Sequence, residues 1–367
     1  MARTHAPRAS RSQADSRPPA AVRDFRGTAA SYEIEWDVRT VYDFVISLSD
    51  DAGSTDDMPP ADRRWLAEAR AGLPESVRAD REALLGSELC SNIAELAVDR
   101  PDVRSPAAFV KAVRELDRRT AAEYLFADMF RETEKADLVR RAVDGDHAAL
   151  ATLAERLPEH NRKGRLELLR DPDGTLRRLS AILAAWQGPF AEIEPRVRAM
   201  ITRDVEARAS EVSRLAPGDL IERVTGGVRY VPEPGIDRVI LAPSYFTRPY
   251  NFLFSRDGWR LYAYPIADAA LDIHDPLEPP LAIVRLHRAL GDPSRLRILR
   301  LLADGDRYLT EIAQALELSK PTIKHHMAQL RAAGLVILTE EGALTYYSLR
   351  REGLDAVGVD LRRFIPG

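Results

Sequence analysis

Hydrophobic residues recur every three or four positions from about residue 31 to residue 216, which is the period of amphipathic helices. The spacing is clear at Leu66, Ala69 and Leu73, and it runs again from Leu84 to Ala97. Proline lacks the amide proton that a helix interior needs, so we expect the prolines here to start or break helices. They are Pro101, Pro106, Pro158, Pro172, Pro189 and Pro195. The pattern predicts a helical domain over 31–216 without a fixed-period repeat.

The pattern changes at Pro217-Gly218, after which Val, Ile, Tyr and Phe alternate with turn residues. Such runs are typical of short strands. The predicted strands are 228–231, 238–241, 250–254 and 259–264. Ser255-Arg256-Asp257-Gly258 has the composition of a hairpin turn between the last two. We therefore expect a small antiparallel β region over 217–275, packed on the helical domain and followed by a proline-rich linker.

Aromatic residues are concentrated in these predicted strands. They are Tyr245, Phe246, Tyr250, Phe252, Phe254, Trp259, Tyr262 and Tyr264. Two interpretations remain open. The favoured one is the core of a small sheet packed on the helices, and the other is an aromatic-lined pocket or a dimer surface.

The remaining segment, 281–367, has the pattern of a compact final domain. A helix is predicted from Pro293 to the turn Asp304-Gly305-Asp306, because proline is suited to the first turn of a helix. A short helix over 309–316 follows, with Ile312 and Leu316 inward and Thr310 as a possible cap. The turn Glu317-Leu318-Ser319 then leads into a third helix.

The third helix, from Lys320 to about Ala333, has one apolar stripe of Ile323, Met327 and Leu330. Ser319 is a good N-cap, and Pro321 lies in the first turn. The polar residues left to project outward are Lys320, Thr322, Lys324, His325 and Gln329. An apolar docking stripe with donors near the N-terminus is what a recognition helix needs to meet base edges and phosphates.

Two short strands, 335–338 and 344–349, follow Gly334 around an acidic turn and form a predicted wing. The whole chain is therefore predicted to be mainly α. It would consist of a helical N-terminal domain with a small antiparallel β region and a C-terminal winged helix-turn-helix over 281–367.

Four linked runs resemble the winged-helix repressors of the ArsR type. They are Leu290-Gly291-Asp292-Pro293-Ser294-Arg295-Leu296-Arg297-Ile298-Leu299, Leu309-Thr310-Glu311-Ile312-Ala313, Ser319-Lys320-Pro321-Thr322-Ile323-Lys324-His325-His326-Met327 and Leu330-Arg331-Ala332-Ala333-Gly334-Leu335-Val336. The resemblance implies a homodimer on double-stranded DNA with a palindromic operator, whose half-sites lie one helical turn, ~34–36 Å, apart.

From this resemblance and the outward positions together, we predict a DNA-binding set on the third helix. It consists of Ser319, Lys320, Pro321, Thr322, Lys324, His325, His326 and Gln329. His326 remains ambiguous, because its angular position also lets it pack at the edge of the core.

Two features depart from the ArsR pattern. The position of the sensing helix contains Tyr308-Leu309-Thr310-Glu311 and no cysteine, so thiolate metal sensing is not expected. The wing tip contains Glu340-Glu341, and acidic side chains repel phosphates, so we expect the wing to contribute little to affinity.

Ahead of the winged helix, the chain resembles more loosely an uncharacterised domain that precedes ArsR-type winged helices in some bacterial regulators. This implies no known ligand.

Charge and composition narrow the class of protein. The net charge is −4, so any nucleic-acid surface must be local. Over 281–350 ten Lys and Arg outnumber seven Asp and Glu, which shifts basic charge toward this segment. Cys90 is the one cysteine, which excludes an intrachain disulfide and a metal site with two thiolates from one chain. It lies in an apolar pattern, so a buried packing residue is favoured over a redox switch.

The termini and hydropathy suggest a location. No apolar run approaches the ~20 residues of a membrane-spanning helix, and no apolar signal segment is visible, so we expect a cytoplasmic, nucleoid-associated protein without a membrane partner. The arginine-rich segment 1–30 is expected to be a disordered tail, either solvated or touching phosphates.

Chemistry elsewhere is sparse. Asp144-Gly145-Asp146-His147 has metal-ligand types, but a polar turn between helices is the simpler interpretation. We expect no catalytic residues, cofactor or metal.

The main hypothesis is a sequence-specific transcriptional regulator, with repression the expected mode, controlled by a small-molecule effector or by dimer contacts of the N-terminal domain. The alternative is an enzyme or an assembly protein that uses the winged helix for protein contact.

Overall fold

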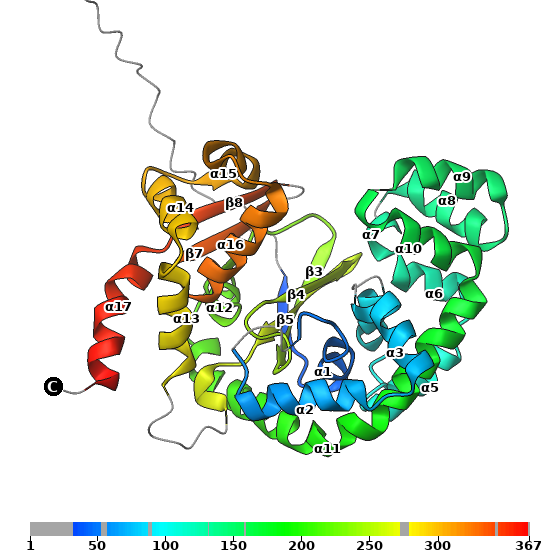
Figure 1. Ribbon diagram of the computed structural model, residues 1–367, viewed down its shortest axis with the longest axis horizontal. Coiled ribbons are helices and arrows are strands. Elements are labelled where there is room, and N and C mark those ends of the chain that lie inside the picture. The colour runs from blue at the N-terminus through cyan, green and yellow to red at the C-terminus, as the bar shows by residue number, and fades with distance from the viewer. Residues whose placement is uncertain are drawn as a thin grey trace, which may run out of the picture.

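The computed structural model describes residues 32–52, 57–86, 90–130, 132–157, 159–271, 279–341 and 344–365. The predicted tail over 1–30 lies outside them. Figure 1 shows a curved arrangement, with the winged helix at one end, helices α6 to α10 at the other, and a sheet between them. Helices α2 (Pro60–Ala71) and α11 (Pro172–Val212) run along the outer edge of the curve.

The N-terminal region is mainly helical over 31–216, as the hydrophobic period predicts. Its further helices are α1 (Val41–Ile46), α3 (Glu75–Arg81), α4 (Leu96–Asp99), α5 (Pro106–Arg114), α6 (Arg118–Leu125), α7 (Ala127–Phe130), α8 (Thr133–Val143), α9 (His147–Arg156), α10 (Glu159–Arg170) and α12 (Pro217–Val224). The stretch 84–97 is not one helix as its spacing suggests. It contains a π turn (Glu82–Gly86) and a 3-10 turn (Ser91–Glu95) before α4.

Helix α11 corrects the expectation for two prolines. Pro189 and Pro195 lie inside this 41-residue helix instead of ending it. Each proline costs one backbone hydrogen bond, and a gently curved helix relieves the clash of its ring; Figure 1 shows α11 following the curve of the molecule. The buried stripe of α11 includes Leu183, Trp186 and Phe190, and this burial outweighs the local cost.

The first sheet corrects the prediction of an antiparallel β region. Its strands are β1 (Glu33–Trp36), β3 (Ile236–Ser244), β5 (Gly258–Pro265) and β4 (Phe252–Arg256), in that order. β1 and β3 are parallel, β3 and β5 are parallel, and β4 forms an antiparallel hairpin with β5. The predicted turn is confirmed, with Gly258 at φ +87°. β3 and β5 are parallel because the chain leaves β3, runs back along the edge of the sheet as β4 and then returns between them as β5. β1 joins the other side of β3 from the start of the chain.

The two faces of this sheet pack on different partners, which explains the run of apolar residues. Ile240 and Leu261 point into the large core made with the helices. Val239 and Tyr262 point to the opposite face, where α12 packs. Most of the aromatic cluster is therefore core, as the favoured interpretation has it, whereas Tyr250 and Phe252 are only partly buried.

The C-terminal segment forms its own core around Ile298, Ile312, Ile323 and Met327. Its elements are α13 (Leu281–Leu290), α14 (Pro293–Ala303), β6 (Arg307–Tyr308), α15 (Leu309–Leu316), α16 (Lys320–Ala332), β7 (Val336–Glu341), β8 (Leu344–Leu349) and α17 (Arg351–Phe364). Among the helices of the described ranges, none has the length and apolar character to cross a membrane.

Strand β2 (Val228–Tyr230) corrects a second expectation. Sequence reasoning assigns it to the small β region, but it pairs in parallel with β7 in a second sheet of order β2-β7-β8-β6. The amide of Leu338 donates to the carbonyl of Gly227 at 2.8 Å, which continues this pairing. The N-terminal region thus adds a strand to the wing.

Candidate nucleic-acid interface

Helix α16 is fixed by its local sequence as predicted. Ile323, Met327 and Leu330 are fully buried, and Ser319 caps the N-terminus by accepting a hydrogen bond from the Thr322 amide at 3.3 Å. Glu317 takes the left-handed conformation, φ 57°, in the turn between α15 and α16. The predicted cap at Thr310 is wrong, because α15 begins after Tyr308, whose amide donates to the Glu311 carboxylate at 2.9 Å.

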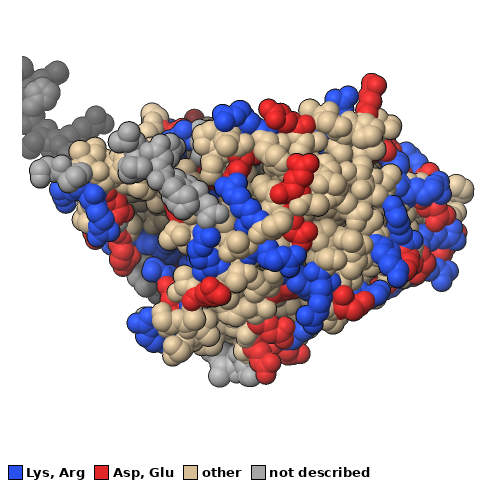
Figure 2. Space-filling view, turned by 90° about the horizontal axis from the view of Figure 1, so that it is seen from below, with Lys and Arg blue, Asp and Glu red and all other residues tan. Residues whose placement is uncertain are grey.

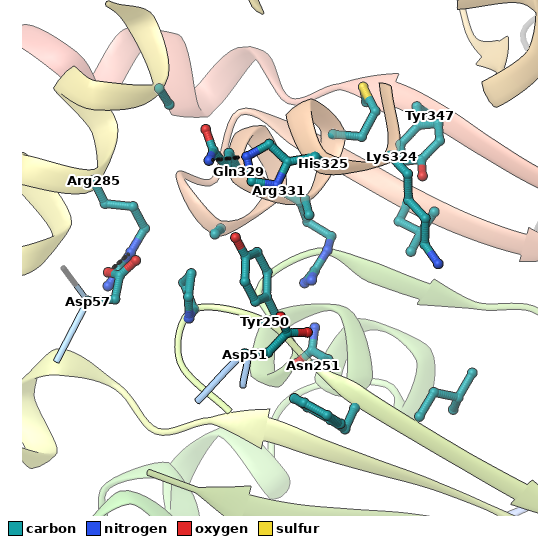
Figure 3. Close-up of a pocket in the computed structure, with 18 of the residues that line it drawn as sticks. Asp51, Asp57, Tyr250, Asn251, Arg285, Lys324, His325, Gln329, Arg331 and Tyr347 are labelled. Atoms are coloured by element: carbon teal, nitrogen blue, oxygen red, sulfur yellow. Dashed lines mark hydrogen bonds and ion pairs between the residues drawn. The ribbon is translucent and has the colours of Figure 1, made fainter. Parts of the chain in front are cut away.

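The predicted DNA-binding residues fall on two sides of α16. Ser319, Lys320 and Thr322 are exposed at its N-terminus, where the Ser319 and Thr322 hydroxyls lie 2.7 Å apart. Lys324 and His325 are also exposed, but they line a cavity between α16 and the N-terminal region, together with Pro321 and Gln329. Figure 3 shows Lys324, His325 and Gln329 among the residues that line this cavity, across from Tyr250 and Asn251.

Gln329 and His326 are less available than the sequence suggests. Gln329 accepts a hydrogen bond from Arg295, and its amide nitrogen lies 2.8 Å from Nε2 of His325. His326 is half-buried, and its Nδ1 has no hydrogen-bond partner among the described residues. Burial lowers the pKa of His326, with Asp292 opposing this effect. These contacts favour packing at the core edge for His326.

Arg331 is a buried cation that sequence reasoning missed. It is 7% exposed, and its Nη1 donates to the backbone carbonyl of Thr225 in the N-terminal region at 3.1 Å. Burial lowers the pKa of Arg331 to about 10. The signal available in the sequence was position, because Arg331 follows Met327 by four residues and so lies on the buried stripe.

The wing is docked on the N-terminal region through charge as well as through β2. Arg260 of β5 is 2.8 Å from Glu233 and 3.6 Å from Glu340 of β7, and its guanidinium lies over the ring of Tyr230. Arg350, beyond the wing, reaches Glu222 at 3.3 Å. The acidic wing residue Glu340 therefore has a structural partner within the chain, which the sequence alone does not reveal.

Helix α13 adds a third connection. Arg285 contacts Asp57 at 2.5 Å and Asp268 at 3.3 Å, and Leu281 belongs to the core of the N-terminal region. The two regions are thus joined by strand pairing, by four ion pairs that three arginines form with carboxylates, and by apolar packing. Together these contacts hold one side of α16 toward the N-terminal region.

Outside α16, the surfaces and motifs considered in the sequence give little indication of a binding site. Figure 2 shows basic and acidic side chains interspersed over the face that carries α2 and α11, so that face is not a broad anion-binding surface. Asp144-Gly145-Asp146-His147 is the polar turn before α9, capped by Asp146 and paired through Arg119 with Asp144. The described residues hold no cluster of His, Cys, Asp and Glu able to bind a metal ion. Cys90 is fully buried, as predicted.

Comparison with known proteins matches residues 292–337 to the family described as bacterial regulatory protein, arsR family. The transcriptional repressor SdpR of Bacillus subtilis is 40% identical over 62 residues, which cover 17% of this chain and 69% of SdpR. The chain belongs to the arsR family. The family match lies within the winged helix, so the name applies to that part of the molecule.

Two further relatives show the extent of the likeness. The regulator CmtR of Mycobacterium tuberculosis is 44% identical over 68 residues, which cover 18% of this chain and 58% of CmtR, so the chain spans little more than half the length of that relative. The structure of HlyU from Vibrio cholerae is 32% identical and covers 22% of this chain and 89% of HlyU, with a TM-score of 0.19. The arsR-family segment is thus a small share of this chain.

Proposed function

We propose that this arsR-family chain is a sequence-specific DNA-binding transcriptional regulator rather than an enzyme, and that α16 is its recognition helix. The observation that carries the proposal is the division of α16 into two faces. Its apolar stripe is fully buried, whereas Lys320, Thr322, Lys324 and His325 are exposed in its N-terminal half. A helix that enters a major groove needs an exposed polar face to contact base edges and phosphates, and an apolar face that holds it on its domain. The similarity to SdpR, a transcriptional repressor, supports repression as the mode.

Within the predicted DNA-binding set, the residues have different proposed roles. Lys320, Thr322, Lys324 and His325 would contact bases and phosphates. Ser319 and Pro321 would shape the helix N-terminus, which favours a phosphate. His326 and Gln329 would act by orienting their neighbours, since Gln329 is already bonded to Arg295.

We propose a homodimer that reads a palindrome through two copies of α16. Helix α17 supports this, because Leu354 and Leu361 are spaced by seven residues and are each 37% exposed. Apolar residues at that spacing share one helix face. A second copy of the helix would bury them.

We propose that the N-terminal region controls the DNA reader. It supplies β2 to the wing and contacts α16 through Thr225. When α16 enters a major groove, which is about 12 Å wide, the phosphates on both sides of the groove come close to the winged helix. The side of α16 that faces the N-terminal region is therefore placed where a change in docking would alter access for DNA.

The test is fluorescence anisotropy of the full chain with a labelled duplex from its own upstream region. We expect tighter binding than to a random duplex, and a binding constant that falls with salt. Replacing Lys324 by alanine should reduce the slope of log K against log salt by about 0.9, the value for one lost phosphate contact.

Lys111→Ala is the matched control, because Lys111 is an exposed lysine on α5 in the N-terminal region. It should leave affinity and slope unchanged. Equal affinity for upstream and random duplexes would contradict sequence-specific reading. An unchanged slope in K324A would contradict the proposed role of α16.

A further inference from the structure

A large cavity lies between the winged helix and the N-terminal region. Its volume is about 1290 Å³, which exceeds the 300–1,000 Å³ of typical small-molecule pockets. Lys324, Arg331 and Tyr347 line it from the winged helix, and Tyr250 and Leu253 line it from the N-terminal region. Figure 3 shows Arg331 pointing from α16 into this space toward Tyr250 and Asn251. We call this cavity the interdomain cleft.

Arg331 is the feature of the cleft that points to a ligand. A guanidinium has five N–H donors, and the hydrogen bond to Thr225 uses one. No carboxylate in the described ranges forms an ion pair with Arg331, although the side chain is 93% buried, as its exposed fraction of 7% implies. A buried cation without a paired anion is costly, so an anion entering the cleft would gain strongly from meeting it.

Polar groups near Arg331 also have hydrogen-bonding capacity that no described residue fills. Asn251 donates its side-chain nitrogen to the same Thr225 carbonyl at 2.9 Å, while its Oδ1 is buried and, within the described residues, lacks a hydrogen-bond partner. Lys324 forms no hydrogen bond or ion pair with any described residue, and it is exposed to the cleft. The wall therefore offers a buried cation, an exposed cation and an unused amide acceptor.

The acidic residues of the cleft do not cancel this charge. Asp57 is paired with Arg285 at 2.5 Å. Glu340 lies 3.6 Å from Arg260, and its charge also raises the pKa of Arg331 against the effect of burial, so Glu340 is shared between the two arginines. Asp51 lines the cleft beside Tyr250. With these three carboxylates against the lining residues Arg285, Arg288, Arg295, Lys324 and Arg331, the cleft keeps an excess of positive charge.

The opposite wall is apolar. Tyr250 and Phe252 are partly buried, and Leu253 is 37% exposed on the edge strand β4. Leu338 of the wing also lines the cleft. This wall would cover the body of a ligand whose charged group meets Arg331, because aromatic and aliphatic surfaces gain by leaving water together.

We propose that the interdomain cleft binds a small organic anion, with a carboxylate or sulfonate held by Arg331 and Lys324 and an aromatic or aliphatic body against Tyr250, Phe252 and Leu253. The regulatory consequence rests on the proposed DNA-binding function. Lys324 belongs both to the cleft and to the recognition helix, so an anion held there competes with a DNA phosphate. By linkage, ligand and DNA weaken each other by the same factor.

The direct test uses the full chain and the aromatic anion anilinonaphthalene sulfonate, with the uncharged phenyl-naphthylamine as its neutral counterpart. We expect saturable fluorescence with one sulfonate probe per chain. Replacing Arg331 by glutamine should weaken the sulfonate probe about tenfold, the scale of one lost charge-assisted contact, and leave the neutral probe within about twofold. Equal losses for both probes would overturn the role of Arg331.

A second variant keeps the test valid if Arg331→Gln fails to fold. Leu253→Trp would fill the cleft from an exposed position, and Leu215→Trp is its matched control, since both leucines are 37% exposed and Leu215 does not line the cleft. The first should weaken the sulfonate probe about tenfold and the second should not change it. Several weak sites, or equal effects of the two variants, would overturn the proposal.

Measuring duplex binding in the presence of the probe distinguishes failure of the cleft site from failure of the DNA-binding function. Saturating sulfonate probe should raise the apparent Kd for the upstream duplex about fivefold or more. Duplex binding with no single probe site would overturn the cleft proposal and leave the regulator intact. A single probe site with the expected variant pattern, but no duplex binding, would overturn the DNA-binding function and leave the cleft site intact.

Discussion

The ion pair between Arg260 and Glu340 gives the sharpest test of how the winged helix is docked. The side chain of Arg260 is 6% exposed and lies between Glu233 and Glu340. Replacing it by methionine keeps an apolar stem of similar length but leaves the two carboxylates without their shared cation. Replacing Glu340 by glutamine removes the wing partner alone. Together the two changes form a double-mutant cycle that isolates the contact between the two regions.

The structure sets the expected size of the coupling. Two unit charges 3.6 Å apart interact by about 4–5 kcal/mol at an effective dielectric constant of about 20. Glu340 is 25% exposed, so solvent screening and the cost of desolvating Arg260 remove most of this energy. We expect a coupling of about 1–2 kcal/mol. The exposed pair Arg300–Asp304, 73% and 57% exposed, should give about 0.5 kcal/mol or less in the same cycle.

The assay is urea unfolding followed by circular dichroism and by tryptophan fluorescence. All four tryptophans precede the winged helix, so fluorescence follows the N-terminal region while dichroism follows both regions. R260M, E340Q and the double variant are compared with the cycle of R300M and D304N. A coupling below about 0.3 kcal/mol, no larger than the usual error of additivity, would refute the docked wing.

Three further outcomes are expected. Burial raises the pKa of Cys90 to about 12, so the native thiol should resist Ellman's reagent at pH 8 and react fully in denaturant; equal rates would contradict its burial. Burial also raises the pKa of Asp43 from 3.8 to about 6, so the folded state binds a proton more readily than the unfolded state. The contribution of this group to stability should therefore fall as pH rises from 4 to 6, and Asp43→Asn should flatten that part of the stability profile; a profile unchanged by D43N would contradict it. Leu361→Asp should shift the chain toward monomer in light scattering, whereas Leu215→Asp, equally exposed at 37%, should not; a dimer that survives L361D would exclude α17 from the interface.

Much of the winged helix could be predicted because its signals are local. The Ser319 cap and the apolar stripe of α16 each depend on residues a few positions apart. The same holds in the N-terminal region for the hairpin of β4 and β5. The same reasoning failed where contacts between residues far apart in the sequence determine the structure. Pro189 and Pro195 remain inside α11 because burial of the helix outweighs a local break. The first sheet is mostly parallel because β1 joins from the start of the chain and β5 inserts between β3 and β4.

The sequence by itself determined that a capped helix of the arsR type exists and that Lys320, Thr322, Lys324 and His325 face outward, since helical period and capping act within one or two turns. Only the tertiary structure decided what surrounds that helix. Arg331 meets the carbonyl of Thr225, which lies 106 residues away, and β2 joins the wing from a similar separation. Hydrophobic period does not specify such partners, because strand pairing and charge burial depend on how the whole chain packs. The contact of the acidic wing with Arg260 and the interdomain cleft follow from that packing.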